Sequence, residues 1–405
     1  MHKHVALYIS NKDDKYKLIE RIVSGQFILD FSHLNGVIFS EKTLSKFIDE
    51  EIRHGNFSVV TRTKNSLLNS SEGERKKALL NHLISQNPEY IIVDNVYGNL
   101  DVYAQKEIEK TLTHLSLKIP IVQITKRKKE VLSFIDNVYC FYDDVFVLYK
   151  EDDVKDANNT ANFTHTLPQP YNPITNQFNP IVKFNNVTIA YGDRTIVNGI
   201  NWEIKSGEFW QLIGPNGSGK STLLSLISGD NPKAYNQDII LFGVKKGSGE
   251  SVWDIKKKIG YFSSEFLRGF ARLHSIENMI ISGFFDSIGL YKIPSDRQIM
   301  LAHQWLYVLE MYDIKDKPFL SLSKGHQRLV LIARAMVKHP PLLILDEPTN
   351  GLDDNDAELF SKLVNKVASE SNTAILYVSH RTEETLLKPD FVYKLVPQIS
   401  GSIGK

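Results

Sequence analysis

A glycine-rich run that ends in lysine and two hydroxyl residues lies just past the middle of the chain: Gly214, Pro215, Asn216, Gly217, Ser218, Gly219, Lys220, Ser221 and Thr222. Its spacing fits G-x-x-x-x-G-K-[ST], a loop whose backbone N–H groups and following helix N-terminus hold phosphate. Lys220 is expected to reach the β- and γ-phosphates of a nucleotide, and Ser221 to place its hydroxyl on Mg²⁺. The alternative is a strand-to-helix turn that binds nothing.

Apolar runs typical of buried strands end in further polar residues. One ends in Asp346 and Glu347, and another in His380. Asp346 suits Mg²⁺, and Glu347 is placed to orient or deprotonate a water molecule. His380 is suited to bond the γ-phosphate, and Tyr191 to stack on adenine. The alternatives are a solvated turn, a histidine with ordinary partners and a packed tyrosine.

A fourth motif, Leu322 to Gln327, opens a helical run shortly before the acidic strand. Ser323 and Gly325 supply an N-cap and a point of close approach, and helix-start N–H groups can also bind phosphate. Together these motifs resemble the ATP-binding cassette (ABC) family over about residues 181–396. The resemblance implies that ATP and Mg²⁺ are the cofactors and that ATP is hydrolysed to ADP and phosphate.

The resemblance also assigns roles to the residues. It makes the glycine-rich run the family's Walker A loop, and Asp346 with Glu347 its Walker B pair. Residues 322–327 become its signature, His380 its switch histidine and Tyr191 its A-loop aromatic.

One position departs from the family pattern. Members usually have a glutamine after the strand run 259–262, where this chain has Ser264. Ser264 can still bond a water molecule or the metal ion, but its shorter reach weakens the expected coupling to a membrane permease. A narrower resemblance, carried by residues 281–291 and 295–298, is to tandem-cassette ATP-binding proteins of molybdate transport.

The first half repeats part of this pattern. Ser71 and Gly73 parallel Ser323 and Gly325, and each serine precedes its acidic strand, at Asp94 and Asp346, by the same number of residues. This equality predicts a tandem duplication.

The loop of the first half has lost its glycines. When Ile9 is matched to Ile213, Tyr16 replaces the lysine. Asp13 and Asp14 would repel phosphate at short range. We therefore expect that this loop does not bind ATP.

Two other positions of the first half are also changed. Asn95 and Lys126 stand where Glu347 and His380 stand in the second half. Because an amide cannot serve as a general base, the first half is predicted to be catalytically silent.

This asymmetry predicts one working site. ABC cassettes hydrolyse ATP in a head-to-tail sandwich, in which the loop of one cassette faces the signature of the other. An intramolecular sandwich would join the second half's loop and carboxylates to Ser71 and Gly73. A homodimer of second halves, using Ser323 and Gly325, is the rival.

Strand-like and helix-like runs alternate around these motifs, which predicts an α/β fold with tandem P-loop NTPase domains, parallel-sheet cores and a helical subdomain. In the first half we expect strands at 5–9, 90–93, 119–125 and 138–141 and helices at 15–23, 74–85 and 101–115. The predicted organisation is a degenerate, truncated cassette at 1–150, an extended, poorly packed linker at 151–180, an intact cassette at 181–396 and a loose tail at 397–405.

Composition limits the partners. The net charge is +1, so no bulk attraction to nucleic acid is expected. Apolar runs are strand-sized, whereas a membrane helix needs about 18 apolar residues. Cys140 is the single cysteine, and the first residues lack a signal-peptide pattern, which favours the cytoplasm or the inner face of the membrane.

Three functions fit these observations. The first is an ATP-binding subunit that works with a membrane permease. The second is a soluble ATPase acting on nucleic acid or ribosomes, which the nearly uncharged linker disfavours. The third is a nucleotide-gated binding module, which retention of Glu347 and His380 disfavours.

Overall fold

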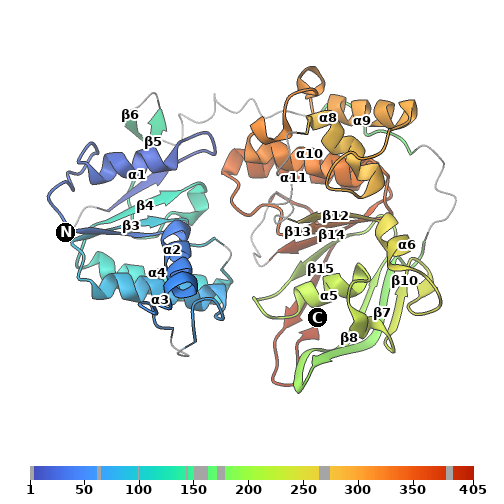
Figure 1. Ribbon diagram of the computed structural model, residues 1–405, viewed down its shortest axis with the longest axis horizontal. Helices are drawn as coiled ribbons and strands as arrows, with labels where there is room; N and C mark the ends of the chain where they lie inside the picture. The colour runs from blue at the N-terminus through green and yellow to red at the C-terminus, as the bar shows by residue number, and fades with distance from the viewer. Residues whose placement is uncertain are drawn as a thin grey trace. The chain divides into compact units, whose positions relative to one another are not determined.

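The computed structural model describes residues 4–61, 65–98, 100–142, 145–149, 163–170, 178–263, 274–379 and 386–405 (Figure 1). The chain forms two compact units. The first is residues 1–159 with 351–355, and the second is residues 160–350 with 356–405. Among the described residues, no helix combines the length and the apolar character needed to cross a membrane.

The first unit is built on a sheet with the strand order β2-β3-β4-β1-β5-β6. Neighbouring strands are parallel except β5 and β6. Helix α1 covers one face of the sheet, and α2, α3 and α4 cover the other (Figure 1). The elements are β1 (Val5–Tyr8), α1 (Lys15–Val23), β2 (Gly36–Phe39), α2 (Glu41–His54), α3 (Glu72–Ser85), β3 (Tyr90–Asp94), α4 (Val102–Ser116), β4 (Ile121–Thr125), η1 (Lys128–Glu130), β5 (Asn137–Tyr142) and β6 (Val145–Leu148).

The second unit has a sheet of matching order, β12-β13-β14-β9-β15-β16, and a smaller antiparallel sheet, β11-β10-β7-β8. Its strands are β7 (Val182–Tyr191), β8 (Arg194–Ile204), β9 (Phe209–Ile213), β10 (Asp238–Leu241), β11 (Val244–Lys245), β12 (Ile259–Ser263), β13 (Leu342–Asp346), β14 (Ala374–Ser379), β15 (Phe391–Val396) and β16 (Ile403–Gly404). Its helices are α5 (Lys220–Ile227), η3 (Pro232–Ala234), α6 (Val252–Lys257), α8 (Ile276–Ile281), η4 (Ser282–Phe285), α9 (Asp296–Val308), η5 (Tyr312–Ile314), η6 (Phe319–Ser321), α10 (Lys324–Met336) and α11 (Asp354–Glu370).

The burial of the central strands agrees with their parallel pairing. Strands β3, β4 and β14 are buried along their whole length, as expected for strands covered by helices on both faces. The predicted α/β fold with parallel-sheet cores is therefore confirmed.

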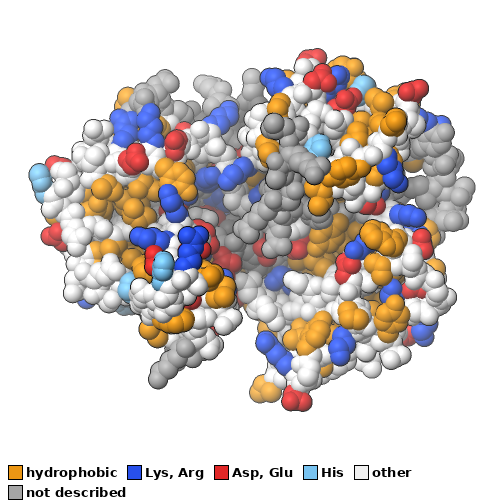
Figure 2. Space-filling model, viewed as in Figure 1, with side chains coloured by type: hydrophobic (Ala, Val, Ile, Leu, Met, Phe, Trp, Pro, Cys, Tyr) orange, Lys and Arg blue, Asp and Glu red, His pale blue; other side chains and the backbone are white. Residues whose placement is uncertain are grey.

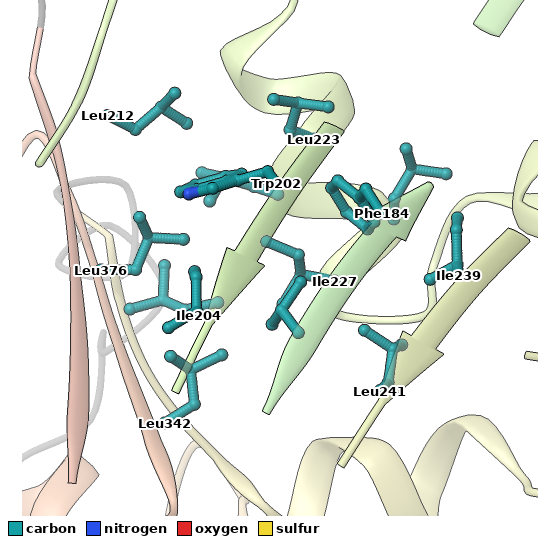
Figure 3. Packing of buried hydrophobic residues seen from close by; sticks show 14 of the residues in the cluster. Phe184, Trp202, Ile204, Leu212, Leu223, Ile227, Ile239, Leu241, Leu342 and Leu376 are labelled. Carbon is teal, nitrogen blue, oxygen red and sulfur yellow. The ribbon is translucent and has the colours of Figure 1, made fainter. Parts of the chain in front are cut away.

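A hydrophobic core joins the two sheets of the second unit (Figure 3). Trp202 of β8 stacks on Tyr393 of β15 with ring centroids 4.4 Å apart, and Leu223 and Ile227 of α5 point into the same cluster. Helix α5 is thus held by apolar contacts on its buried side, which fixes the loop that precedes it.

Strand register corrects the alignment of the two halves. Tyr8 at the end of β1 pairs with Thr125 of β4, and Ile213 at the end of β9 pairs with Ser379 of β14. Because Thr125 and Ser379 occupy matching places in the two sheets, Tyr8 rather than Ile9 matches Ile213.

The lysine of the first loop is consequently retained. Helix α1 begins at Lys15 and α5 at Lys220, equally far beyond Tyr8 and Ile213. The prediction that Tyr16 replaces the lysine was wrong. Helix α1 has 9 residues and α5 has 8, and this extra residue shifts the alignment between the start and the end of the helix.

The segments predicted to be loosely packed are partly ordered. In the predicted linker, Leu167 is buried, its N–H donates to Glu370 Oε2 (3.0 Å), and His339 Nε2 lies 2.8 Å from the carbonyl oxygen of Pro168. The predicted tail forms β16, which pairs with β15, and Ser402 N–H donates to Ile196 O. Both segments pack because neighbouring backbone and apolar surface offer them partners.

Candidate active site

The glycine-rich loop connects the buried strand β9 to helix α5. Gly217 and Gly219 have φ values of +76° and +96°, which L side chains rarely adopt. A Cβ on Gly219 would also lie 2.6 Å from the Val197 side chain. Glycine is therefore required at these two positions, where the chain turns from the loop into the start of α5.

The loop has a buried cation and a buried hydroxyl at its centre. Lys220 is 8% exposed and its Nζ donates to Gly214 O (2.6 Å) and Pro215 O (3.2 Å). Ser218 is 1% exposed, and its Oγ has no hydrogen-bond partner among the described residues. A tight backbone cradle with these two groups fits the phosphates of ATP.

The carboxylates lie at the same edge of the sheet as the loop. Asp346 pairs with Val378, one residue before Ser379, which pairs with Ile213. Asp346 Oδ2 accepts a hydrogen bond from Tyr261 Oη (3.3 Å), a partner that sequence reasoning missed. Asp346 and Ser221, the second residue of α5, both offer hard oxygen ligands of the kind that Mg²⁺ prefers.

Glu347 leaves the strand in an unusual conformation. Its φ is +46°, in the left-handed region, and its N–H donates to Val378 O (2.9 Å). Its Oε2 accepts from Asn350 Nδ2 (2.7 Å). These contacts fix both the backbone and the carboxylate of the predicted catalytic base.

Arg328 of α10 supports the loop that follows Glu347, and the sequence analysis missed it. It is 4% exposed, and its guanidinium donates to the carbonyl oxygens of Pro348 and Asn350. Arg328 follows the polar residues 324–327, so no sequence pattern marked it as buried, although a buried guanidinium needs acceptors.

The signature of the second unit begins α10 as predicted. Ser323 is the N-cap, and its Oγ accepts from His326 N–H (3.2 Å) and lies 2.7 Å from His326 Nδ1. A Cβ on Gly325 would lie 2.0 Å from Asp356 Oδ1, so this glycine permits a close approach. The predicted N-cap and close approach are both present.

The first unit has the same arrangement at the start of α3. Ser71 is the N-cap, and its N–H and Oγ donate to Glu74 Oε2 (3.0 and 2.9 Å). These bonds, the backbone one foremost, lower the pKa of Glu74 below its ordinary value. A Cβ on Gly73 would lie 3.2 Å from Ala104 Cβ. Ser71 therefore has an ionised carboxylate beside it.

Tyr191 ends β7 and is anchored to the residues beyond α5. Its Oη accepts from Asn231 Nδ2 (2.9 Å), and the side chain is half-exposed. A cleft of about 450 Å³ lies beside Gly217, lined by residues 193–196 and by 397–399 with 401–402. The sequence analysis did not expect the C-terminal segment to lie next to the phosphate loop. His380 and Ser264 lie outside the described residues.

The sequence is similar to known proteins over both halves. A family model described as "ABC transporter" matches residues 197–350. The "ABC transporter ATP-binding protein ModF" of Escherichia coli is 40% identical over 329 residues, covering 78% of this chain and 67% of the relative. The "Uncharacterized ABC transporter ATP-binding protein C323.04" of Schizosaccharomyces pombe is 31% identical over 327 residues, covering 79% and 66%. The chain thus spans about two thirds of the length of these relatives.

A solved structure is similar over the whole chain. It is a complex of archaeal ribosomal stalk protein aP1 and archaeal ribosome recycling factor aABCE1, with a TM-score of 0.63 and 14% identity, covering 99% of this chain and 85% of that one. At this identity the similarity shows the fold alone.

Proposed function

The chain belongs to the ABC family of ATP-binding proteins and is an ATPase, and on this premise we propose that it hydrolyses ATP at one composite site. The difference between Glu347 and Asn95 carries the proposal. Asn95 has a φ of +52° against +46° for Glu347, and its N–H donates to Ile124 O as that of Glu347 does to Val378 O. Asn95 thus has the backbone of the catalytic position without its carboxylate.

The residues of the second unit divide the chemistry among them. Lys220 would leave its backbone acceptors to bind the β- and γ-phosphates, while Ser221 and Asp346 would hold the metal ion. Bound Mg²⁺ supplies positive charge that offsets the charge developing on the phosphates. Glu347 orients the attacking water and accepts its proton, and His380 bonds the γ-phosphate.

The remaining part of the proposed site is a signature. In an intramolecular sandwich, Ser71 and Gly73 of the first unit close over the γ-phosphate, as their match to Ser323 and Gly325 suggests. The matching strand orders of the two six-stranded sheets, β2-β3-β4-β1-β5-β6 and β12-β13-β14-β9-β15-β16, support an origin by tandem duplication. The sandwich would then close when ATP binds and open after hydrolysis.

Substitution of Glu347 tests the hydrolytic proposal. Glu347→Gln removes the proton acceptor and keeps the volume, so kcat should fall by about 10²-fold to 10⁴-fold while ATP stays bound. Single-turnover hydrolysis and retention of radiolabelled ATP measure the two effects. Asn95→Asp is the matched control in the first unit and should leave kcat unchanged. Full activity of the Glu347 variant would exclude this base.

We further propose that the protein is the ATP-binding protein of a molybdate-type transport system, located in the cytoplasm or at the inner face of the membrane. Similarity to ModF, a protein named for ABC transport, supports this role. The ATP-trapped Glu347→Gln protein should retain its partner, so affinity capture with ATP is the test. Recovery of a membrane permease is expected. Recovery of ribosomes or nucleic acid would instead support the soluble alternative.

A further inference from the structure

The first unit's loop occupies the place of a nucleotide site. It runs from β1 to the start of α1, as the glycine-rich loop runs from β9 to α5, and it has the same length. Lys15 stands at the position of Lys220, and Asp94 at that of Asp346. In this unit, the groups at these positions are bound to side chains of the protein itself.

Carboxylates accept from several N–H groups of the loop and of the start of α1, whereas Lys12 N–H donates to Ser10 Oγ (3.1 Å). Asp14 is the N-cap of α1, and its Oδ1 accepts from the N–H groups of Tyr16 (3.0 Å) and Lys17 (3.3 Å). Asp13 Oδ2 accepts from Ser10 N–H (2.7 Å). In a functional phosphate loop, such N–H groups point at phosphate oxygens.

Another carboxylate comes from residues 351–355, which belong to the first unit. Asp353 Oδ2 accepts from Asn11 N–H (2.8 Å). The loop donors at residues 10, 11, 16 and 17 are therefore all bound to aspartate oxygens.

A lysine takes the place of the metal ion. Lys15 Nζ lies 2.7 Å from Asp94 Oδ2, and the Asp94 side chain is 8% exposed. An ionised carboxylate at this depth needs a cation close by. In the second unit the corresponding Asp346 fits Mg²⁺, whereas in the first unit the cation is part of the chain.

We propose that the first unit contains a nucleotide site permanently occupied by the protein's own charges, with Lys15 in place of the metal ion and aspartates in place of phosphate. ATP is excluded from this loop because these side chains occupy the site, in addition to the loss of the glycines. This inference concerns only the first unit and does not depend on where ATP is hydrolysed.

Local hydrogen exchange in the full-length protein tests the proposal. Lys15→Ala removes the cation and leaves Asp94 buried, so exchange at residues 90–94 should become at least about 10-fold faster. Lys15→Arg keeps the charge and should exchange nearly as wild type. Lys15→Ala combined with Asp94→Asn removes both charges and should restore most of the protection.

Magnesium ion alone is the probe for the metal position. Millimolar Mg²⁺ should slow exchange at residues 90–94 in the Lys15→Ala protein, because it can replace the missing cation on Asp94. It should have no such effect in the double variant, whose second unit is identical. Wild-type exchange in the Lys15→Ala protein, or equal responses of the single and double variants to Mg²⁺, would overturn the proposal.

Discussion

At the scale of single residues, the two halves differ in chemistry more than in backbone. Glu347 and Asn95 share a left-handed φ and the same bond to the neighbouring strand. Such a conformation costs free energy in a residue other than glycine and is kept where the surroundings determine it. The first half therefore has the same turn, with the amide of Asn95 in place of the carboxylate of Glu347.

Arg328 should affect catalysis through the loop that follows Glu347. Arg328→Met keeps most of the side-chain volume but removes the donors to Pro348 O and Asn350 O. The loop then loses its fixed position, and we expect kcat to fall by about 10-fold with a small change in KM for ATP. Steady-state ATPase assays measure both constants.

Arg334 supplies the matched control on the same helix. It is 9% exposed, and its guanidinium donates to Ser282 Oγ (3.0 Å) and Ser287 O (2.8 Å), which are not part of the proposed site. Arg334→Met should lower the free energy of unfolding by about 1–3 kcal/mol, as should Arg328→Met. Its kcat should remain near wild type. Equal loss of kcat in both variants would mean that Arg328 acts only through stability.

At the scale of elements, the two signature helices start alike but carry different charges. Ser71 at the start of α3 bonds ionised Glu74, whereas Ser323 at the start of α10 bonds His326. A carboxylate beside a phosphate-binding serine opposes the charge of ATP. The first half's signature is therefore electrostatically less favourable than the serine and glycine spacing alone implied.

Serine substitutions at the two helix starts distinguish the two sandwich arrangements. Ser71→Ala and Ser323→Ala each remove an N-cap, at a similar cost of about 1 kcal/mol of stability. In the intramolecular arrangement, Ser71→Ala should lower kcat/KM by about 10-fold and Ser323→Ala should not, because a charge-assisted bond to phosphate is lost only in the first. The reverse pattern would favour the homodimer.

Much of the first half's element order could be predicted from sequence. Helix α1 (Lys15–Val23) has the predicted bounds, because Asp14 caps it and apolar residues repeat along one face. Strand β2 and helix α2 were missed, although Ser40 and Gly55 supply ordinary N-cap and C-cap signals. The strand is only four residues long and too short for a clear pattern.

The contacts inside the sites were less predictable. The ion pair of Lys15 with Asp94 and the hydrogen bond of Arg328 to Pro348 O both join residues that are far apart in the sequence. Only the folded structure shows these contacts. The loop alignment failed for a related reason. One additional residue in α1 changes the offset between the two halves. The change falls within a helix, where no strand pairing is present to fix the alignment.

At the scale of the molecule, charge gives little indication of a partner. Lys and Arg total 48 and Asp and Glu total 47, and Figure 2 shows both kinds interspersed over the visible face. No large surface of one sign is seen on that face to attract a polyanion. Charge on this face therefore does not indicate which of the proposed partners the protein binds.

A mixing experiment determines whether one chain or two form the hydrolytic site. If Ser71 and Gly73 complete the site within one chain, activity per chain should not depend on protein concentration. Excess Glu347→Gln protein added to wild type should leave the wild-type rate unchanged, since each chain works alone. In a homodimer of second halves, the inactive chain would pair with wild type and suppress its activity in proportion to the excess, and that suppression would rule out the intramolecular site.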